Sequence, residues 1–312
     1  MKKISFIIPC YNSEKFISTT IEELQNTIEN DLKDFQTEII LINDSSRDKT
    51  FEVIEKLSIT YENVVAVDMS KNFGQHGAIF AGLSLSNGDI IVCLDDDGQT
   101  PPNEVKKLIN ALDEDVDVVY AKYSNKRHNN FRNFGSKVND LMAESLLNKP
   151  KELYISSYFC MKKYIKQEIL KYNNPYPYLE GLILRTTNKI KNVEINHRER
   201  KIGESNYTIK KLLHLWINGF TSFSVKPLRI AIFFSFLFVL LAIIISVVIS
   251  INKIKNPMVP LGWSSVMVIL LLIGASITFI LGLIGEYIGR IYISINNSPQ
   301  YVIRKISKHD NE

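Results

Sequence analysis

Two long runs without a charged side chain constrain the fold of this chain more than any other feature. They span residues 230–251 and 261–284, which are 22 and 24 residues long. A helix needs about 20 apolar residues to cross the hydrocarbon core of a bilayer. The alternative, burial of both runs in a soluble core, is less favoured because a soluble helix of this length almost always keeps a polar face. The runs therefore predict two transmembrane helices.

The short linker at residues 252–260 makes the two helices a hairpin, so both chain ends lie on the same side of the membrane. Basic residues are concentrated on that side: Lys210, Lys211, Lys226, Arg229, Arg290, Arg304, Lys305 and Lys308. The linker holds only Lys253 and Lys255. The positive-inside rule then predicts a protein of the cytoplasmic membrane with two spans, in which both termini and the large domain are cytosolic.

Charge also separates the hairpin from the rest of the chain. The net charge is +4, yet the first 228 residues hold 30 basic and 30 acidic residues. Because a nucleic-acid-binding domain needs a basic face, this balance argues against nucleic acid as a partner. The three cysteines are an odd number in apolar contexts, which indicates reduced thiols.

Short apolar runs rich in β-branched residues alternate with helical patterns before the hairpin. The runs lie at residues 4–8, 38–42, 64–68, 90–94 and 116–120, and the helical patterns at 14–29, 48–59, 75–86 and 102–112. This alternation predicts an α/β domain with a mostly parallel sheet. Ligands of such sheets bind at the carboxyl ends of the strands, where polar residues follow four of the runs, at 9–12, 43–46, 70–74 and 95–99.

Three consecutive aspartates, residues 95–97, end the fourth apolar run. Their carboxylates repel one another unless a cation or ligand offsets the charge, and such oxygen ligands suit Mg²⁺ or Mn²⁺ bridging to the phosphates of a nucleotide. A solvated acidic turn, or a helix cap before Pro101 and Pro102, explains the three residues equally well. Other phosphate or metal motifs are missing: the glycines at 74, 77 and 82 have the wrong spacing for a dinucleotide fingerprint, there is no P-loop sequence, and the five histidines lack zinc spacing.

The ordered segments carry a family resemblance. They are IIPCYNSE, LINDSSRDKT, SKNFGQHGAIFAGL, LDDDGQTPP and ERKIGESNYTIKKLL, followed by the hairpin and GEYIGRIY. Together they resemble the family 2 glycosyltransferases with the GT-A fold, and within them the polyprenyl-phosphate glycosyltransferases. The resemblance covers essentially the whole chain. It implies a nucleotide sugar as donor, a UDP-sugar by preference, and a polyprenyl phosphate such as undecaprenyl phosphate as acceptor.

The resemblance assigns site residues by position. The nucleotide sugar would be lined by Pro9, Tyr11, Glu14, Asn43, Asp44, Lys71, Asp95 and Asp96. Asp97 and Gln99 would be direct ligands of Mg²⁺ or Mn²⁺, with Asp95 near the ribose and the metal's waters. The lipid phosphate would be held by Lys122, Arg132, Ser136, Arg200 and Ser205. Asp97, Arg132, Arg200 and Glu180 form the predicted catalytic set.

Four places in the sequence depart from the family pattern, and one of them is Thr100, which replaces the usual acid before Pro101 and Pro102. Asn43 stands where the second strand usually ends in the first of two aspartates, and Lys122 stands where an arginine is common. The stretch 155–160 lacks an acid often found there, so that role passes to Glu180, for which a solvated loop acid is an equal alternative.

The predicted organisation has four parts. A GT-A domain covers residues 1–207, a juxtamembrane amphipathic segment 208–228, the transmembrane hairpin 229–285, and a cytosolic tail 286–312. In the segment 208–228, Leu212, Leu215, Trp216 and Phe220 lie largely on one side, which favours a helix in the membrane interface over core packing. Relatives of this kind often form homo-oligomers through their membrane helices.

The expected activity is inverting, metal-dependent transfer of one sugar to undecaprenyl phosphate at the cytosolic membrane face, for modification of cell-envelope glycans. Two alternatives are weighed against it. One is a catalytically inactive homologue that acts as a nucleotide- or lipid-binding membrane scaffold, which Asn43 keeps open. The other is a processive polysaccharide synthase, disfavoured because such enzymes carry more spans and a Q-x-x-R-W element that this chain lacks.

Overall fold

The computed structural model describes residues 1–98, 100–123, 149–175, 177–196, 262–296 and 298–309, with scattered single residues between 237 and 255. The chain forms two compact units. One comprises residues 1–208 and 297–312, and the other comprises residues 209–296. Each unit is described by itself below.

The first unit alternates strands and helices, as the sequence predicts. Its elements in chain order are β1 (Lys3–Cys10), α1 (Ile17–Asp31), β2 (Gln36–Asn43), α2 (Thr50–Thr60), β3 (Val64–Met69), α3 (Gly74–Leu85), β4 (Ile90–Cys93), η1 (Pro102–Glu104), α4 (Val105–Asn110), β5 (Val118–Tyr123), β6 (Phe159–Lys162), α6 (Lys163–Ile169), α7 (Leu179–Thr186), β7 (Ile190–Ile195) and β8 (Ile303–Lys308). The five predicted strands correspond to β1–β5, and the predicted helices to α1–α4.

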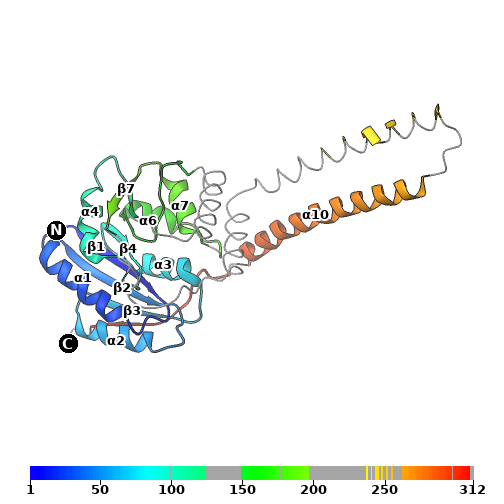
Figure 1. The fold of residues 1–312 in the computed structure, drawn as a ribbon. Coiled ribbons are helices and arrows are strands. Elements are labelled where there is room, and N and C mark those ends of the chain that lie inside the picture. Colours follow the sequence, from blue (N-terminus) through cyan, green and yellow to red (C-terminus); the bar gives the residue numbers. More distant parts are fainter. Residues whose placement is uncertain are drawn as a thin grey trace. The chain divides into compact units, whose positions relative to one another are not determined.

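The eight strands in the described part of the chain form one sheet, in the order β7-β5-β6-β4-β1-β2-β3-β8. Helices flank this sheet in Figure 1. Neighbours β3, β2, β1 and β4 are parallel, as are β5 and β7. Strand β6 runs antiparallel to both β4 and β5, and β8 runs antiparallel to β3. The prediction of a mostly parallel α/β sheet is therefore confirmed, although the sequence indicated neither the antiparallel strands β6 and β8 nor the parallel strand β7.

The central strand β1 is buried on both faces, which explains its unbroken apolar sequence. Phe6 and Ile8 pack with Ile17 of α1 and Ile54 of α2 in one cluster. On the opposite face, Ile7 packs against α3 where residue 82 is a glycine. A Cβ atom there would lie 2.6 Å from Ile7 Cγ2, so only glycine lets the helix approach this closely. Helices thus cover both faces of the sheet.

A segment close to the end of the chain, Ile303–Lys308, also belongs to the sheet. Strand β8 pairs with β3, and the backbone N–H of Ser70 donates to the carbonyl of Val302 (2.9 Å). Lys305 and Ser307 both bond to the carboxylate of Glu55 on α2 (2.6 and 2.7 Å). The segment predicted only as a tail, residues 286–312, therefore contains an edge strand of the first unit.

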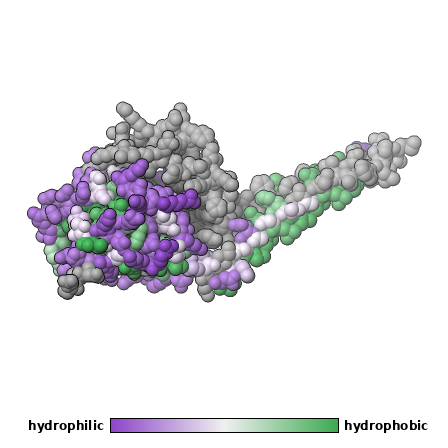
Figure 2. Space-filling view, turned by 90° about the horizontal axis from the view of Figure 1, so that it is seen from below, coloured by the Kyte–Doolittle hydropathy of each residue, from purple (hydrophilic) through white to green (hydrophobic). Residues whose placement is uncertain are grey.

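The second unit contains α10 (Trp263–Ile295), a single helix of 33 residues that continues past the predicted end of the span at residue 284. Its window Leu272–Gly289 is long and apolar enough to cross a membrane, and it is the one such helix in the described part of the chain. Figure 2 shows hydrophobic residues along much of the length of this helix. The first predicted span, 230–251, and the predicted amphipathic segment, 208–228, lie outside the described residues, apart from a few positions.

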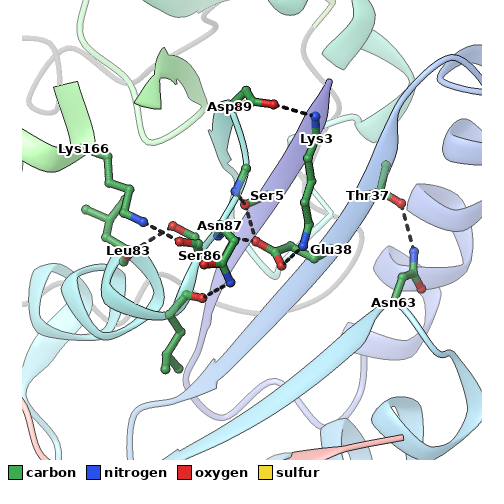
Figure 3. A network of polar contacts seen from close by, with 12 residues as sticks. Lys3, Ser5, Thr37, Glu38, Asn63, Leu83, Ser86, Asn87, Asp89 and Lys166 are labelled. Carbon is green, nitrogen blue, oxygen red and sulfur yellow. Dashed lines mark hydrogen bonds and ion pairs between the residues drawn. The ribbon is translucent and has the colours of Figure 1, made fainter. Parts of the chain in front are cut away.

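A polar network joins the amino ends of the strands (Figure 3). Glu38 of β2 accepts hydrogen bonds from the Ser5 hydroxyl and the Asn87 N–H, and it pairs with Lys3 Nζ at 2.6 Å. Burial alone would raise the pKa of Glu38, but these hydrogen bonds and the Lys3 charge lower it below its ordinary value. The network lies at the opposite end of the strands from the polar residues singled out in the sequence.

Replacing Glu38 tests this network. Because the pKa of Glu38 is lowered in the folded state, its stabilisation is present above the unfolded pKa of about 4.3 and is lost as the pH falls. We expect Glu38→Gln to destabilise the full chain in detergent at pH 7 by about 2 kcal/mol. The thermal midpoints of variant and wild type should approach each other as the pH falls below about 4. A difference between the two thermal midpoints that does not change with pH would contradict this account.

Candidate functional site

The carboxyl ends of β1, β2 and β4 lie side by side, because β1 pairs in parallel with both other strands. Three polar loops follow these ends, at residues 9–14, 43–49 and 94–98. We call this region the carboxyl edge. Two non-glycine residues here adopt a positive φ, Asn12 at 56° and Ser45 at 53°. The two loops interlock: Asn12 N–H donates to Ser46 Oγ (3.0 Å), and Arg47 N–H donates to Asn12 Oδ1 (3.0 Å).

Asp96 joins the β4 loop to the β1 loop. Its carboxylate accepts from the Tyr11 N–H (3.2 Å) and from the Ser13 hydroxyl, and its carbonyl accepts from Thr20 Oγ1 (3.1 Å). Burial of the carboxyl group, with the neighbouring charges of Asp95 and Asp97, raises the pKa of Asp96 to about 7, although the bonds from Ser13 and Tyr11 oppose that rise. The middle carboxylate of the three therefore ties the β4 loop to the β1 loop.

The two flanking aspartates are partly buried. Asp95 accepts from Gln75 Nε2 of α3 (3.1 Å) and from the Ser157 hydroxyl. Asp97 is followed by Gly98 in a positive-φ conformation (72°), which turns the chain directly after the carboxylates. In the described part of the chain no group of three or more His, Cys, Asp or Glu side chains has a metal-binding arrangement. Gln99, the predicted third ligand, lies outside that part.

Asp44 holds the start of helix α3. Its two carboxylate oxygens accept from the N–H groups of Phe73 (2.7 Å) and Gly74 (2.9 Å), where Gly74 has a φ of 81°. Burial raises the pKa of Asp44 above its ordinary value, and these two bonds oppose the rise. The capped turn carries Lys71, whose ammonium lies 5.0 Å from the centroid of the Phe73 ring. Asp44 thus positions the predicted cation of the nucleotide site.

Asn43 makes a contact that explains its identity. Its side-chain N–H donates to Asp68 Oδ1 of β3 at 2.7 Å, and both side chains are buried. The other oxygen of Asp68 lies 3.4 Å from Arg304 Nη1 of β8. An aspartate at position 43 would face Asp68 with a second carboxylate. Asparagine at position 43, in place of the aspartate usual in the family, therefore avoids repulsion between two carboxylates and donates a hydrogen bond to Asp68.

Other predicted site residues also have defined places. Pro9 lies in β1 opposite Ile42, Tyr11 is exposed, and Glu14 accepts from the Lys49 N–H before α2 (3.0 Å). Lys122 lies near the end of β5, and its Nζ is 4.0 Å from Oε1 of the exposed Glu194. Arg132, Ser136, Arg200 and Ser205 lie outside the described residues. The structure therefore brings the predicted nucleotide residues to one edge.

Glu180, in the first turn of α7, faces residues that the sequence analysis did not single out. Its Oε2 lies 3.8 Å from His76 Nε2 on α3, and the His76 ring contacts Tyr178 edge-on, with centroids 5.4 Å apart. Like Asp68, Ser157 and Arg304, His76 enters the site through contacts between distant segments, so no local pattern signals it. His76 and Gln75 both lie within the quoted segment 70–83, but nothing in that segment indicates their contacts with Glu180 and Asp95.

An open α/β sheet binds its ligands at the carboxyl ends of its strands, which is where these carboxylates lie. Residues 5–172 match the profile of glycosyl transferase family 2, and residues 226–291 match that of the GtrB C-terminal hairpin. The chain belongs to glycosyl transferase family 2, and the predicted family is confirmed. It is therefore a glycosyltransferase, and its C-terminal hairpin indicates membrane association.

Relatives match almost the whole chain. An uncharacterized glycosyltransferase, YkcC of Bacillus subtilis, is 31% identical over 96% of this chain and 93% of its own. The undecaprenyl-phosphate 4-deoxy-4-formamido-L-arabinose transferase of Photorhabdus laumondii is 28% identical over 98% of this chain and 94% of its own. Among solved structures, glucosyl-3-phosphoglycerate synthase from Mycobacterium tuberculosis, in complex with Mn²⁺ and UDP-glucose, has a TM-score of 0.53 at 17% identity, covering 71% of this chain and 77% of that one. This likeness concerns the fold.

Proposed function

We propose that this protein transfers one sugar from a nucleotide sugar, a UDP-sugar by preference, to undecaprenyl phosphate at the cytosolic face of the cytoplasmic membrane. The observation that carries the proposal is the full-length similarity to an undecaprenyl-phosphate sugar transferase, which spans both the sheet domain and the hairpin. The carboxylates and Lys71 at the carboxyl edge supply the groups that a nucleotide diphosphate requires.

The nucleophile is the phosphate oxygen of the acceptor. A phosphate monoester has a second pKa of about 6, so it is mostly dianionic at pH 7 and needs no strong general base. It needs positive charge to approach the donor's diphosphate, and Arg132, Arg200 and Lys122 are the proposed sources. Attack opposite the leaving diphosphate inverts the anomeric carbon. Glu180 orients a hydroxyl of the sugar.

Asp97 and Gln99 are the proposed ligands of Mg²⁺ or Mn²⁺, with Asp95 close by. Hard oxygen donors fit such an ion, and Asp96 and Ser157 hold the loop and Asp95 in place for it. When bound, the ion stabilises the charge of the departing diphosphate. The ion found in the synthase of similar fold is Mn²⁺. The membrane assay below compares the activity with Mg²⁺ to the activity with Mn²⁺.

The test incubates membranes containing the full chain with undecaprenyl phosphate, Mg²⁺ or Mn²⁺, and separate UDP-sugars, including UDP-glucose, UDP-N-acetylglucosamine and UDP-glucuronic acid. Mass spectrometry of the extracted lipid is expected to detect undecaprenyl phosphate carrying one sugar. Chelation of the metal should abolish the product. Nucleotide binding without a product from any donor would favour the membrane-scaffold alternative.

A further inference from the structure

Four buried polar atoms have no hydrogen-bond partner among the residues that the structure describes. One of them, Glu104 Oε2, forms an ion pair with Lys107 (2.5 Å). The other three are Tyr120 Oη on β5, His76 Nδ1 on α3 and Glu180 Oε2 on α7. Tyr120 is fully buried. Leaving such a group unpaired costs about 1–3 kcal/mol, so native structures keep few of them. Three such unpaired atoms in the first unit therefore require an explanation.

Two of these side chains lie close together, although they come from separate elements. His76 Nε2 is 3.8 Å from Glu180 Oε2. The third, Tyr120, is linked to them electrostatically, because burial and after it the charge of Glu180 raise the pKa of the Tyr120 phenol. His76 directly follows Gln75, which bonds to Asp95. The unpaired atoms therefore adjoin the carboxylate loop.

The chemistry of this group favours a hydroxyl-bearing ring. A carboxylate accepts hydrogen bonds from hydroxyls, and a phenol and an imidazole each donate or accept one. Aromatic rings border the polar atoms: Tyr178 contacts His76, and Phe159 lies 5.4 Å from the Tyr120 ring centroid. Glu180 contributes a negative charge, which repels a sugar that carries its own carboxylate.

We propose that His76, Tyr120 and Glu180 form a recognition subsite for the donor's sugar, selective for a neutral sugar with free hydroxyls over a uronic acid. This inference rests on the proposed function and deepens it, because it assigns His76 and Tyr120 a role and gives the donor a chemical class. Glu180 accepts from sugar hydroxyls, while Tyr120 and His76 pair with hydroxyls of the same ring.

Two fully buried tyrosines provide a matched test. Tyr158 Oη donates to the Pro101 carbonyl at 3.2 Å, whereas Tyr120 Oη has no partner among the described residues. A purely structural view predicts that Tyr120→Phe is harmless, because it removes an unpaired hydroxyl. We expect Tyr120→Phe to keep or raise the thermal midpoint and to lower kcat/KM for the sugar donor about tenfold. Tyr158→Phe should lower the midpoint and leave donor selectivity unchanged.

Glu180→Gln tests the charge in the full chain. For the neutral donor that the wild type uses in the membrane assay, kcat/KM should fall about tenfold, since the sugar hydroxyl then donates to a neutral amide oxygen in place of a carboxylate. Inhibition by UDP, which has no sugar, should stay within about twofold in both Glu180→Gln and Tyr120→Phe. The wild type should use UDP-glucuronic acid poorly. Glu180→Gln should lower the ratio of kcat/KM for the neutral donor to kcat/KM for UDP-glucuronic acid.

The inference is overturned if Tyr120→Phe transfers sugar as efficiently as the wild type, or if the wild type uses UDP-glucuronic acid as well as neutral donors. An equal loss of UDP affinity in the variants would also overturn it, because the residues would then serve the nucleotide. Absence of any lipid-linked product with the wild type is a separate result, which contradicts the proposed function itself.

Discussion

Asp97→Ala is expected to reduce sugar transfer by about a thousandfold, because the proposed metal would lose a charged ligand beside the departing diphosphate. Asp95 and Asp96 do not replace it. Their carboxylates accept hydrogen bonds from Ser157 and Gln75, and from Ser13 and the Tyr11 N–H. The measurement is formation of lipid-linked sugar in membranes, together with UDP affinity at increasing Mn²⁺ concentration. The variant should lose the metal-dependent part of that affinity.

Two comparisons sharpen this prediction. Asp97→Asn keeps the shape of the side chain and removes its charge, so it should lose nearly as much activity as Asp97→Ala. Glu62→Ala removes an exposed acid just before β3, at the amino ends of the strands, and should leave transfer unchanged. Activity of Asp97→Ala near the wild-type level would refute the metal assignment.

Most of the first unit's fold could be predicted, because strands β1–β5 are apolar runs and helices α1 and α2 between them each bury one face. The missed strands lack that signal. Strand β6 has only four residues. Strand β8 reads IRKISK, mostly exposed and basic, which is the pattern of a protected sheet edge. From sequence alone, such a strand looks like a solvated tail.

The carboxyl edge could also be predicted, but the contacts within it could not. The position of Asp44 is visible in the sequence, whereas its bonds to Phe73 and Gly74 join segments 29 and 30 residues apart. The same holds for Asp96 and Tyr11, which are 85 residues apart. These carboxylates shape the loops by accepting from backbone N–H groups. Such long-range pairing depends on the tertiary fold, which a local pattern does not record.

Asn43→Asp is expected to destabilise the first unit by about 3 kcal/mol at pH 8, because it would place two carboxylates in buried hydrogen-bond contact. The wild-type amide donates to Asp68 at 2.7 Å, and an ionised aspartate has no proton to donate. Below neutral pH one of the two carboxyl groups retains a proton and restores the bond. Since that pKa is raised in the folded state, the stability of the variant should fall as the pH rises. Thermal unfolding of the full chain in detergent between pH 5 and pH 8 measures this slope.

Exchanging the amide and the carboxylate between positions 43 and 68 shows whether repulsion from Asp68, and not any change at position 43, destabilises the variant. The double variant Asn43→Asp with Asp68→Asn again pairs one amide with one carboxylate, so it should recover most of the lost stability. It gives up the ion pair between Asp68 and Arg304, but the arginine side chain is 60% exposed, and a pair of this kind contributes little. Asp68→Asn alone should therefore cost less than Asn43→Asp. If the double variant is no more stable than Asn43→Asp, the asparagine is retained for another reason, and contact with the nucleotide then becomes the stronger explanation.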